Sequence, residues 1–279
     1  MIRHRRHVLA NILLFVSTFA AAAPNIADQH REDIAQFRAE FFAKDRAYSA
    51  TARAEAERRL VELDRAAADM KPAAFDLEIA RLVALADNGH TESLAASRSR
   101  RYDRIEIRLT PFGEDFYVLR SQERHAELLG AKLLAIGGVT LEKLRLRYRA
   151  LHDGVAHWRD RGAAYFLESP EQLRADGVVA DPGELGYRFM LPDGTTIERK
   201  LTVTAGGTDR TRGNALRWMN PSFDVIEGNA WRVLLAAEKM PWSLQDTGKV
   251  FRWRIDPALN AIVVDMRQTA NTKDEKLAD

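Results

Sequence analysis

The chain has 279 residues, with 42 lysines and arginines against 40 aspartates and glutamates, no cysteine, and 46% hydrophobic residues. This composition is that of a globular protein and excludes a disordered or fibrous chain. The absence of cysteine excludes disulfides, a thiolate zinc site and a cysteine nucleophile. The length is sufficient for one to three domains with a substantial core.

Residues 1–22 have the features of an export signal. Arg3, Arg5 and Arg6 give a positive start, an apolar stretch follows, and small residues precede the predicted cleavage point after Ala22. The apolar stretch is shorter than the about 20 residues that a transmembrane helix needs. A buried or amphipathic N-terminal helix and a twin-arginine signal are the alternatives. The sequence therefore predicts export, periplasmic or secreted, with no stable membrane insertion after the signal is removed.

Removal of this signal changes the charge balance. The signal holds three arginines and no acidic residue, so 42 basic residues less three leave 39 against 40 acidic ones, a net charge of −1. A nearly neutral chain lacks the excess of basic residues with which proteins bind nucleic acids. We therefore predict no nucleic-acid partner.

Residues 26–97 are predicted to form a helical bundle. Asp28 and Ser49 are candidate N-caps of the first two helices, and Pro72 suits the first turn of a third. Apolar residues recur at helical spacing in all three segments, and Gly89 follows the last one as a stop signal. Amphipathic helices with short links favour a compact bundle.

After residue 104, apolar and polar residues alternate along the chain, which is typical of half-buried strands. The fold class is therefore predicted to be α+β, with a β-rich domain at 104–205 that carries a helical insertion, and a linker and further lobe at 206–279. Strands are predicted at 105–109, 116–119, 132–136, 187–191, 196–203, 249–255 and 260–266, and short helices at 122–129, 141–151 and 171–175.

Two short segments stand out by their order along the chain. The first is Asp87-Asn88-Gly89-His90-Thr91, and the second, at 128–139, reads LLGAKLLAIGGV. Together they resemble the tail-specific (C-terminal processing) serine protease family in its exported bacterial form. That resemblance implies that 104–205 is a PDZ-like domain and that the strand at 260–268 begins a protease core. The segments depart from the family pattern at Asn88, within a motif that is commonly Gly-Asp-Gly-His, and at Gly137, where an acidic or amide residue is more usual.

The resemblance also implies a chemistry, which is peptide-bond hydrolysis by a serine activated by a lysine of lowered pKa. The core that carries both residues would follow 260–268, and the sequence ends at Asp279. We therefore predict no catalytic residue in this chain and no peptidase activity from it alone. Ser222 and Lys249 are the pair that most resembles a Ser/Lys dyad, but the sequence around Ser222 predicts a surface turn. No cofactor and no metal site are predicted.

A PDZ-like domain binds a peptide as an added strand, so the implied partners are the C-termini of peptides or unfolded proteins. By order along the chain, residues 111–114 would hold the terminal carboxylate. The predicted docking strand comprises Phe116, Tyr117, Val118 and Leu119. A closed module that binds no peptide is the alternative at this point.

The remaining candidates each have two interpretations. His90 is predicted to lie near the family's active site, or else to interact with the last carbonyls of a helix. The basic run 145–149 would attract an anion or form a solvated helix face. His152 and His157 are badly spaced for a shared metal. Four tryptophans would line a groove or pack in a core, namely Trp218, Trp231, Trp242 and Trp253.

The sequence leaves two further interpretations of the whole chain. One is a stand-alone periplasmic module that binds peptides or proteins without catalysis. The other is a truncated gene product, for which exposed apolar surface is expected at the last strands because their partners would be missing.

Overall fold

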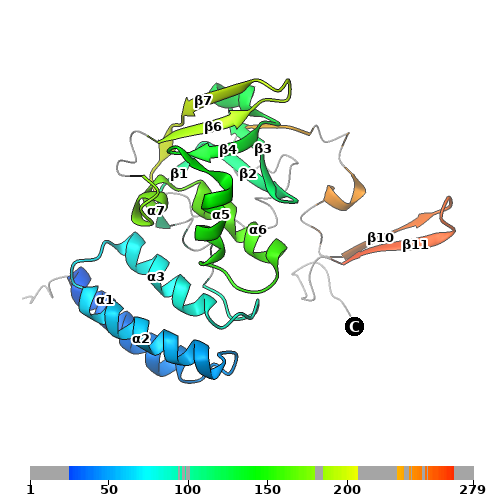
Figure 1. Ribbon diagram of the computed structural model, residues 1–279. Coiled ribbons are helices and arrows are strands. Elements are labelled where there is room, and N and C mark those ends of the chain that lie inside the picture. The colour runs from blue at the N-terminus through cyan, green and yellow to red at the C-terminus, as the bar shows by residue number, and fades with distance from the viewer. Residues whose placement is uncertain are drawn as a thin grey trace, which may run out of the picture.

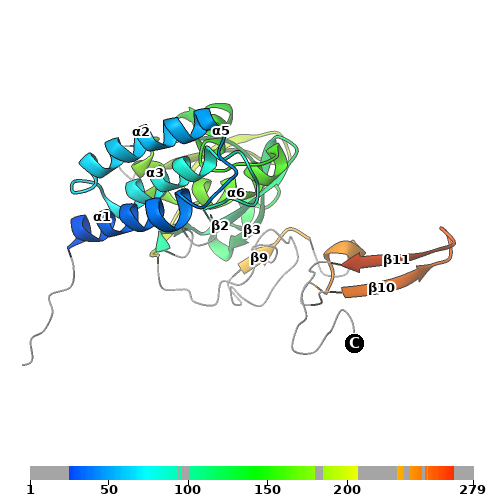
Figure 2. The same ribbon diagram turned by 90° about the horizontal axis from the view of Figure 1, so that it is seen from below.

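The computed structural model describes residues 25–93, 95, 98, 101–179, 185–206, 231–235, 239, 241–246, 249 and 251–266. The described chain combines helices with antiparallel sheets, so the fold class is α+β. Helices and a main sheet form one body, and a two-stranded hairpin projects from it (Figures 1 and 2). No helix within the described ranges has the length and apolar character to cross a bilayer. The predicted signal at 1–22 lies outside them.

The N-terminal helices begin close to their predicted caps. Helix α1 (Ile26–Gln36) starts at Asn25, whose side chain accepts a hydrogen bond from the Asp28 N–H, so the cap lies three residues before the predicted one. It continues into a π-helical turn, η1 (Phe37–Phe42). Helix α2 (Ala50–Ala66) is capped by Ser49, and α3 (Pro72–Ala84) carries Pro72 in its first turn, both as predicted. These helices share an apolar core that includes Ile34, Phe37, Phe42, Leu60, Phe75 and Leu82.

The main sheet is antiparallel along the path β2-β3-β4-β6-β7. Its strands are β2 (Ile107–Phe112), β3 (Asp115–Gln122), β4 (Lys132–Ile136), β6 (Gly186–Met190) and β7 (Thr196–Lys200). A 3-10 helix, η2 (Glu123–Leu128), links β3 to β4. Two short strands extend the sheet, since β5 (Val139–Thr140) pairs with β4 and β9 (Trp231–Val233) pairs with the second half of β3. A separate pair joins β1 (Arg104–Ile105) to β8 (Val203–Thr204).

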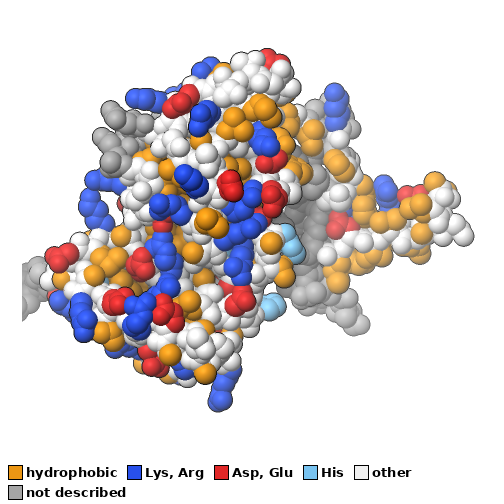
Figure 3. Space-filling view, in the orientation of Figure 1, with side chains coloured by type: hydrophobic (Ala, Val, Ile, Leu, Met, Phe, Trp, Pro, Cys, Tyr) orange, Lys and Arg blue, Asp and Glu red, His pale blue; other side chains and the backbone are white. Residues whose placement is uncertain are grey.

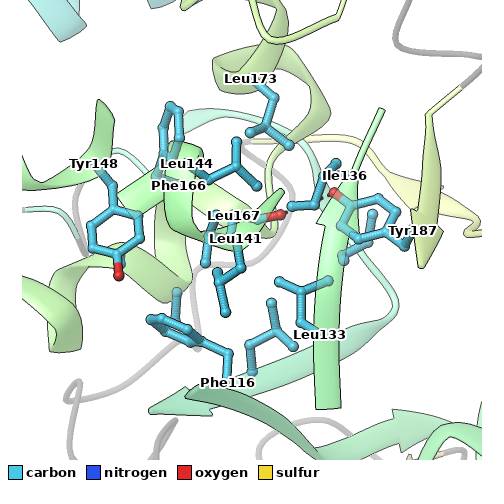
Figure 4. Packing of buried hydrophobic residues seen from close by; sticks show 14 of the residues in the cluster. Phe116, Leu133, Ile136, Leu141, Leu144, Tyr148, Phe166, Leu167, Leu173 and Tyr187 are labelled. Carbon is cyan, nitrogen blue, oxygen red and sulfur yellow. Dashed lines mark hydrogen bonds between the residues drawn. The ribbon is translucent and has the colours of Figure 1, made fainter. Parts of the chain in front are cut away.

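Three helices lie between β5 and β6 in the chain, namely α5 (Leu141–Arg149), α6 (Ala156–Leu167) and α7 (Pro170–Ala175). Figure 4 shows how their apolar side chains meet those of the sheet, with Tyr148 of α5 near Phe116 of β3 and with Phe166 of α6 beside Leu144. Leu77 and Ala80 of α3 belong to the same buried cluster. The N-terminal helices are therefore packed onto the sheet domain through α3.

The C-terminal described segment contains η6 (Trp242–Leu244) and the hairpin of β10 (Phe251–Asp256) and β11 (Ala261–Met266). The hairpin is paired without a bulge from Phe251↔Met266 to Asp256↔Ala261. The final pair of strands predicted from alternation is thus present. Strand β9, which lies in the segment assigned to the linker and further lobe, is instead an added strand of the main sheet.

Candidate functional site

A groove lies where the loop after α3 meets the start of α6. Its cavity volume is about 1060 Å³. One side is the loop that carries the sequence motif at 87–90, and the other is the loop and first turn of α6. The lining residues are Ala47, Ala86, Asp87, Asn88, Gly89, His90, Glu92, Gly154, Val155, His157 and Trp158.

Two glycines allow these loops to approach so closely. Gly154 has a φ of +78°, and a Cβ built on it would lie 2.8 Å from the Cα of Gly89. The loop around Gly89 is held by polar contacts: the Asp87 carboxylate forms an ion pair with Arg159 of α6, and the Asn88 N–H donates to the Asp153 carboxylate over 3.4 Å. The groove is therefore a fixed junction between α3 and α6.

Replacing Gly154 by alanine is expected to lower the free energy of unfolding by more than the penalty for a side chain at positive φ, because the new Cβ would also clash with Gly89. Gly177 is a matched control, because its φ is +72° and a Cβ there would meet no atom within 4 Å. Gly177→Ala should cost about 1–2 kcal/mol of the free energy of unfolding, the usual penalty of a left-handed residue. Gly154→Ala adds a clash with backbone, so at least about 1 kcal/mol more is expected by urea unfolding. Equal losses in the two variants would contradict the close contact.

Two titratable residues, His152 and Asp153, lie buried next to this junction. Burial lowers the pKa of His152 to about 3, and the charges of Arg98 and Arg159 act in the same direction. Its ring packs on Gly162 of α6, and its Nε2 has no hydrogen-bond partner among the described residues. Burial raises the pKa of Asp153 to about 6, against the hydrogen bond from Asn88. At neutral pH the imidazole is therefore neutral and the carboxylate is ionised.

The predicted docking strand is occupied along both edges. Phe116 pairs with Pro111 of β2, Tyr117 pairs with Lys132 of β4, and the Leu119 carbonyl accepts a hydrogen bond from Leu234 N–H at 2.9 Å. Val118 donates to Ala131 and accepts from Gly130 on the same side as β4. A peptide strand could add at Phe116, Tyr117, Val118 and Leu119 only by displacing these neighbours, as in the alternative of a closed module.

The predicted carboxylate loop at 111–114 is part of a tight hairpin. Phe112 and Asp115 are paired, and only Gly113, with a φ of +60°, and Glu114 lie between them. The Glu114 carbonyl accepts a hydrogen bond from Arg145 of α5. This turn presents an acidic residue where a terminal carboxylate would have to bind.

The basic run of α5 is matched by acidic residues. Arg147 pairs with Asp176 at 3.0 Å, and Arg149 donates two hydrogen bonds to Asp160. Arg145 likewise pairs with Glu114. The three arginines are thus paired with acidic residues, and of the three only Arg147 is exposed.

The structure places His90 on the rim of the groove. Its side chain is exposed and its N–H donates to the Asn88 side chain at 3.1 Å. Across the groove lie His157 and Trp158, which sequence reasoning did not assign to a site. The sequence did not predict their helix, α6. The one local feature that indicates its start is Gly154, two residues before it.

The other predicted candidates lie elsewhere. Trp231 lies 4.4 Å from the Arg108 guanidinium, Trp242 lies 4.1 Å from that of Arg252, and Trp253 is exposed. Trp218 and Ser222 fall outside the described residues. Within the described ranges, no three His, Asp or Glu side chains are grouped as metal ligands.

Comparison with known proteins gives a distant structural similarity. No family model matches the chain, and no curated protein matches it. Two similar solved structures are of CPAF, a chlamydial serine protease of the tail-specific type. Mature CPAF is 14% identical with a TM-score of 0.39, over 64% of this chain and 35% of that one. A serine-to-alanine mutant of CPAF is 14% identical with a TM-score of 0.40, over 66% and 35%. The chain spans about a third of the length of these structures.

Proposed function

We propose that this chain binds polypeptide as the exported, non-catalytic front part of a serine peptidase of the tail-specific type. The catalytic serine and lysine are assigned to a core outside this sequence, and the binding site to the groove between α3 and α6. The observation that carries the proposal is this groove, in which the motif at 87–90 that resembles the family lies against α6.

The dimensions and walls of the groove suit an extended polypeptide. Its volume of about 1060 Å³ lies just above the range typical of small-molecule sites, about 300–1,000 Å³. Gly89 and Gly154 lie in the wall of the groove, where they bring its two loops together. Val155, 60% exposed, and the half-buried Trp158 offer apolar contacts, and His90 and His157 offer hydrogen bonds.

The charges of the groove favour internal polypeptide segments over free C-termini. Among the described lining residues, the charged ones are Asp87 and Glu92, and no lysine or arginine is present. Asp87 is already paired with Arg159, so a terminal carboxylate would meet Glu92 with no lysine or arginine among the described lining residues. Unfolded segments with apolar side chains are therefore the proposed ligands. The same site would also serve a stand-alone periplasmic binding module.

The proposal is tested by titrating the full chain with a labelled apolar peptide, as free acid and as amide. We expect both forms to bind with equal affinity, and Trp158→Ala to weaken binding at least about fivefold, since a buried aromatic anchor contributes more than about 1 kcal/mol. Trp253→Ala, a tryptophan outside the groove, is the matched control and should leave the affinity per chain unchanged. No binding of either form, or equal loss in the two variants, would reject the groove as the site.

A further inference from the structure

The projecting hairpin has one entirely apolar face. Residues directly opposite each other in an antiparallel pair share a face, so three cross-strand pairs lie together. Each of the six side chains is 40–66% exposed, and Figure 3 shows hydrophobic side chains along this arm. The pairs are Phe251 with Met266, Trp253 with Val264, and Ile255 with Ile262.

The opposite face of the hairpin carries Arg252, Arg254 and Asp265, and it is covered in part. Arg252 is only 8% exposed, because its guanidinium lies 4.1 Å from the Trp242 ring and pairs with Asp265 at 2.9 Å. Arg254 also lies over Trp242, at 4.9 Å. The hairpin thus reverses the usual arrangement of a sheet, in which the apolar face is buried and the polar face is in solvent. A surface of this kind marks an interface.

We propose that this apolar face packs against the same face of a second copy of the chain. The face carries no charged or polar side chain, so it is complementary to itself and has nothing that would specify a polar partner. The hairpin projects from the body in both views, which leaves room for a second hairpin to lie on it (Figures 1 and 2). The net charge of the chain is only +2, so two copies repel each other weakly.

The exposed area agrees with a dimer. Six partly exposed apolar side chains supply on the order of 600 Å² per copy, two of them aromatic. Burying both faces removes about 1,200 Å² from water, the lower end of specific interfaces. The expected product is a two-sheet sandwich about 10 Å thick with a two-fold axis near the central pair, Trp253 and Val264. An area at this limit predicts a micromolar dissociation constant for the dimer.

Two adjacent valines of β11 provide a matched test. Val264 lies in the centre of the apolar face, and Val263 lies on the opposite face, paired with Arg254. Val264→Glu places a carboxylate from each copy in the interface, and should raise the dimer dissociation constant at least about 100-fold. Val263→Glu places the same charge next to an arginine, and should leave the constant within about threefold. The measurement is sedimentation equilibrium of the full chain over a range of concentrations around 10 µM.

Each outcome decides the inference. A reversible monomer–dimer equilibrium that is lost in Val264→Glu and kept in Val263→Glu supports it. A wild-type chain that stays monomeric up to about 100 µM, open-ended aggregation in place of a dimer, or equal behaviour of the two variants would overturn it. Circular dichroism and thermal unfolding of both variants check that the body is intact. Peptide binding in the groove is measured separately, so its failure would not be mistaken for failure of the dimer.

Discussion

Replacing Glu168 by glutamine is expected to lower the free energy of unfolding by at least about 3 kcal/mol, because it removes one partner of a buried ion pair. Glu168 and Arg104 are each only 1% exposed at the side chain and form a direct ion pair. The second guanidinium, that of Arg108, lies 3.7 Å from the same carboxylate oxygen. The amide side chain keeps the shape and loses the negative charge, so the attraction of this carboxylate for two buried cations is lost.

Glu168 also connects three elements. Its carboxylate accepts the Leu109 N–H of β2 at 2.7 Å, its backbone carbonyl accepts the Ile105 N–H of β1 at 2.9 Å, and the residue itself ends α6. Arg108 extends the connection to β9, because its guanidinium lies over Trp231. The loss of charge in Glu168→Gln should therefore destabilise the joint between α6 and the sheet as a unit.

Urea unfolding of Glu168→Gln against wild type measures this effect. Glu62→Gln is the control, since Glu62 pairs with Arg58 on the exposed side of α2, where both side chains are more than half exposed. Exposed pairs contribute little, so its unfolding midpoint should stay unchanged. If Glu168→Gln were as stable as Glu62→Gln, the buried charge would not be needed for the fold.

Local sequence signals predicted the elements that depend on local interactions. Ser49 caps α2, Pro72 begins α3, and β4 spans the predicted residues 132–136, because capping, fixed φ and alternation act within a few residues. The cap of α1 is Asn25 and not the predicted Asp28. Both residue types cap helices, so the local sequence does not decide between the two positions.

Helix α6 and the groove could not be predicted in the same way. The run from Ala163 to Leu167 is buried at every position, so it lacks the amphipathic period by which a helix is recognised. Without α6, the sequence could place His90 but not the facing His157 and Trp158. The docking strand expected at 116–119 lies between its hairpin partner β2 and β4, and the Leu119 carbonyl accepts a hydrogen bond from Leu234 N–H, more than 100 residues later in the chain. Non-local pairing of this kind leaves no mark on the local pattern.

Replacing Asp153 or His152 by an uncharged side chain is expected to change the pH dependence of the free energy of unfolding in opposite directions. The pKa of Asp153 is raised from 3.8 to about 6, so between these values the folded chain binds one more proton there, and this residue stabilises the fold as pH falls. The pKa of His152 is lowered from 6.5 to about 3, so the unfolded chain binds the extra proton, and this residue destabilises the fold as pH falls. In wild type the two contributions oppose each other between about pH 6 and 4.

In each single variant, the pH dependence of stability should therefore show the contribution of the residue that was not replaced. Between pH 6 and 4, Asp153→Asn should lose about 1 kcal/mol per pH unit relative to wild type, and His152→Gln should gain about as much. The double variant should run parallel to wild type, because both terms are then absent. Urea unfolding at several pH values from 4 to 7 gives these slopes, and the other carboxylates cancel in the differences. Both residues lie buried beside the groove. If the stability curves of both single variants ran parallel to that of wild type, neither group would be held in a dry environment. The junction of α3 and α6 would then be open to water at this point.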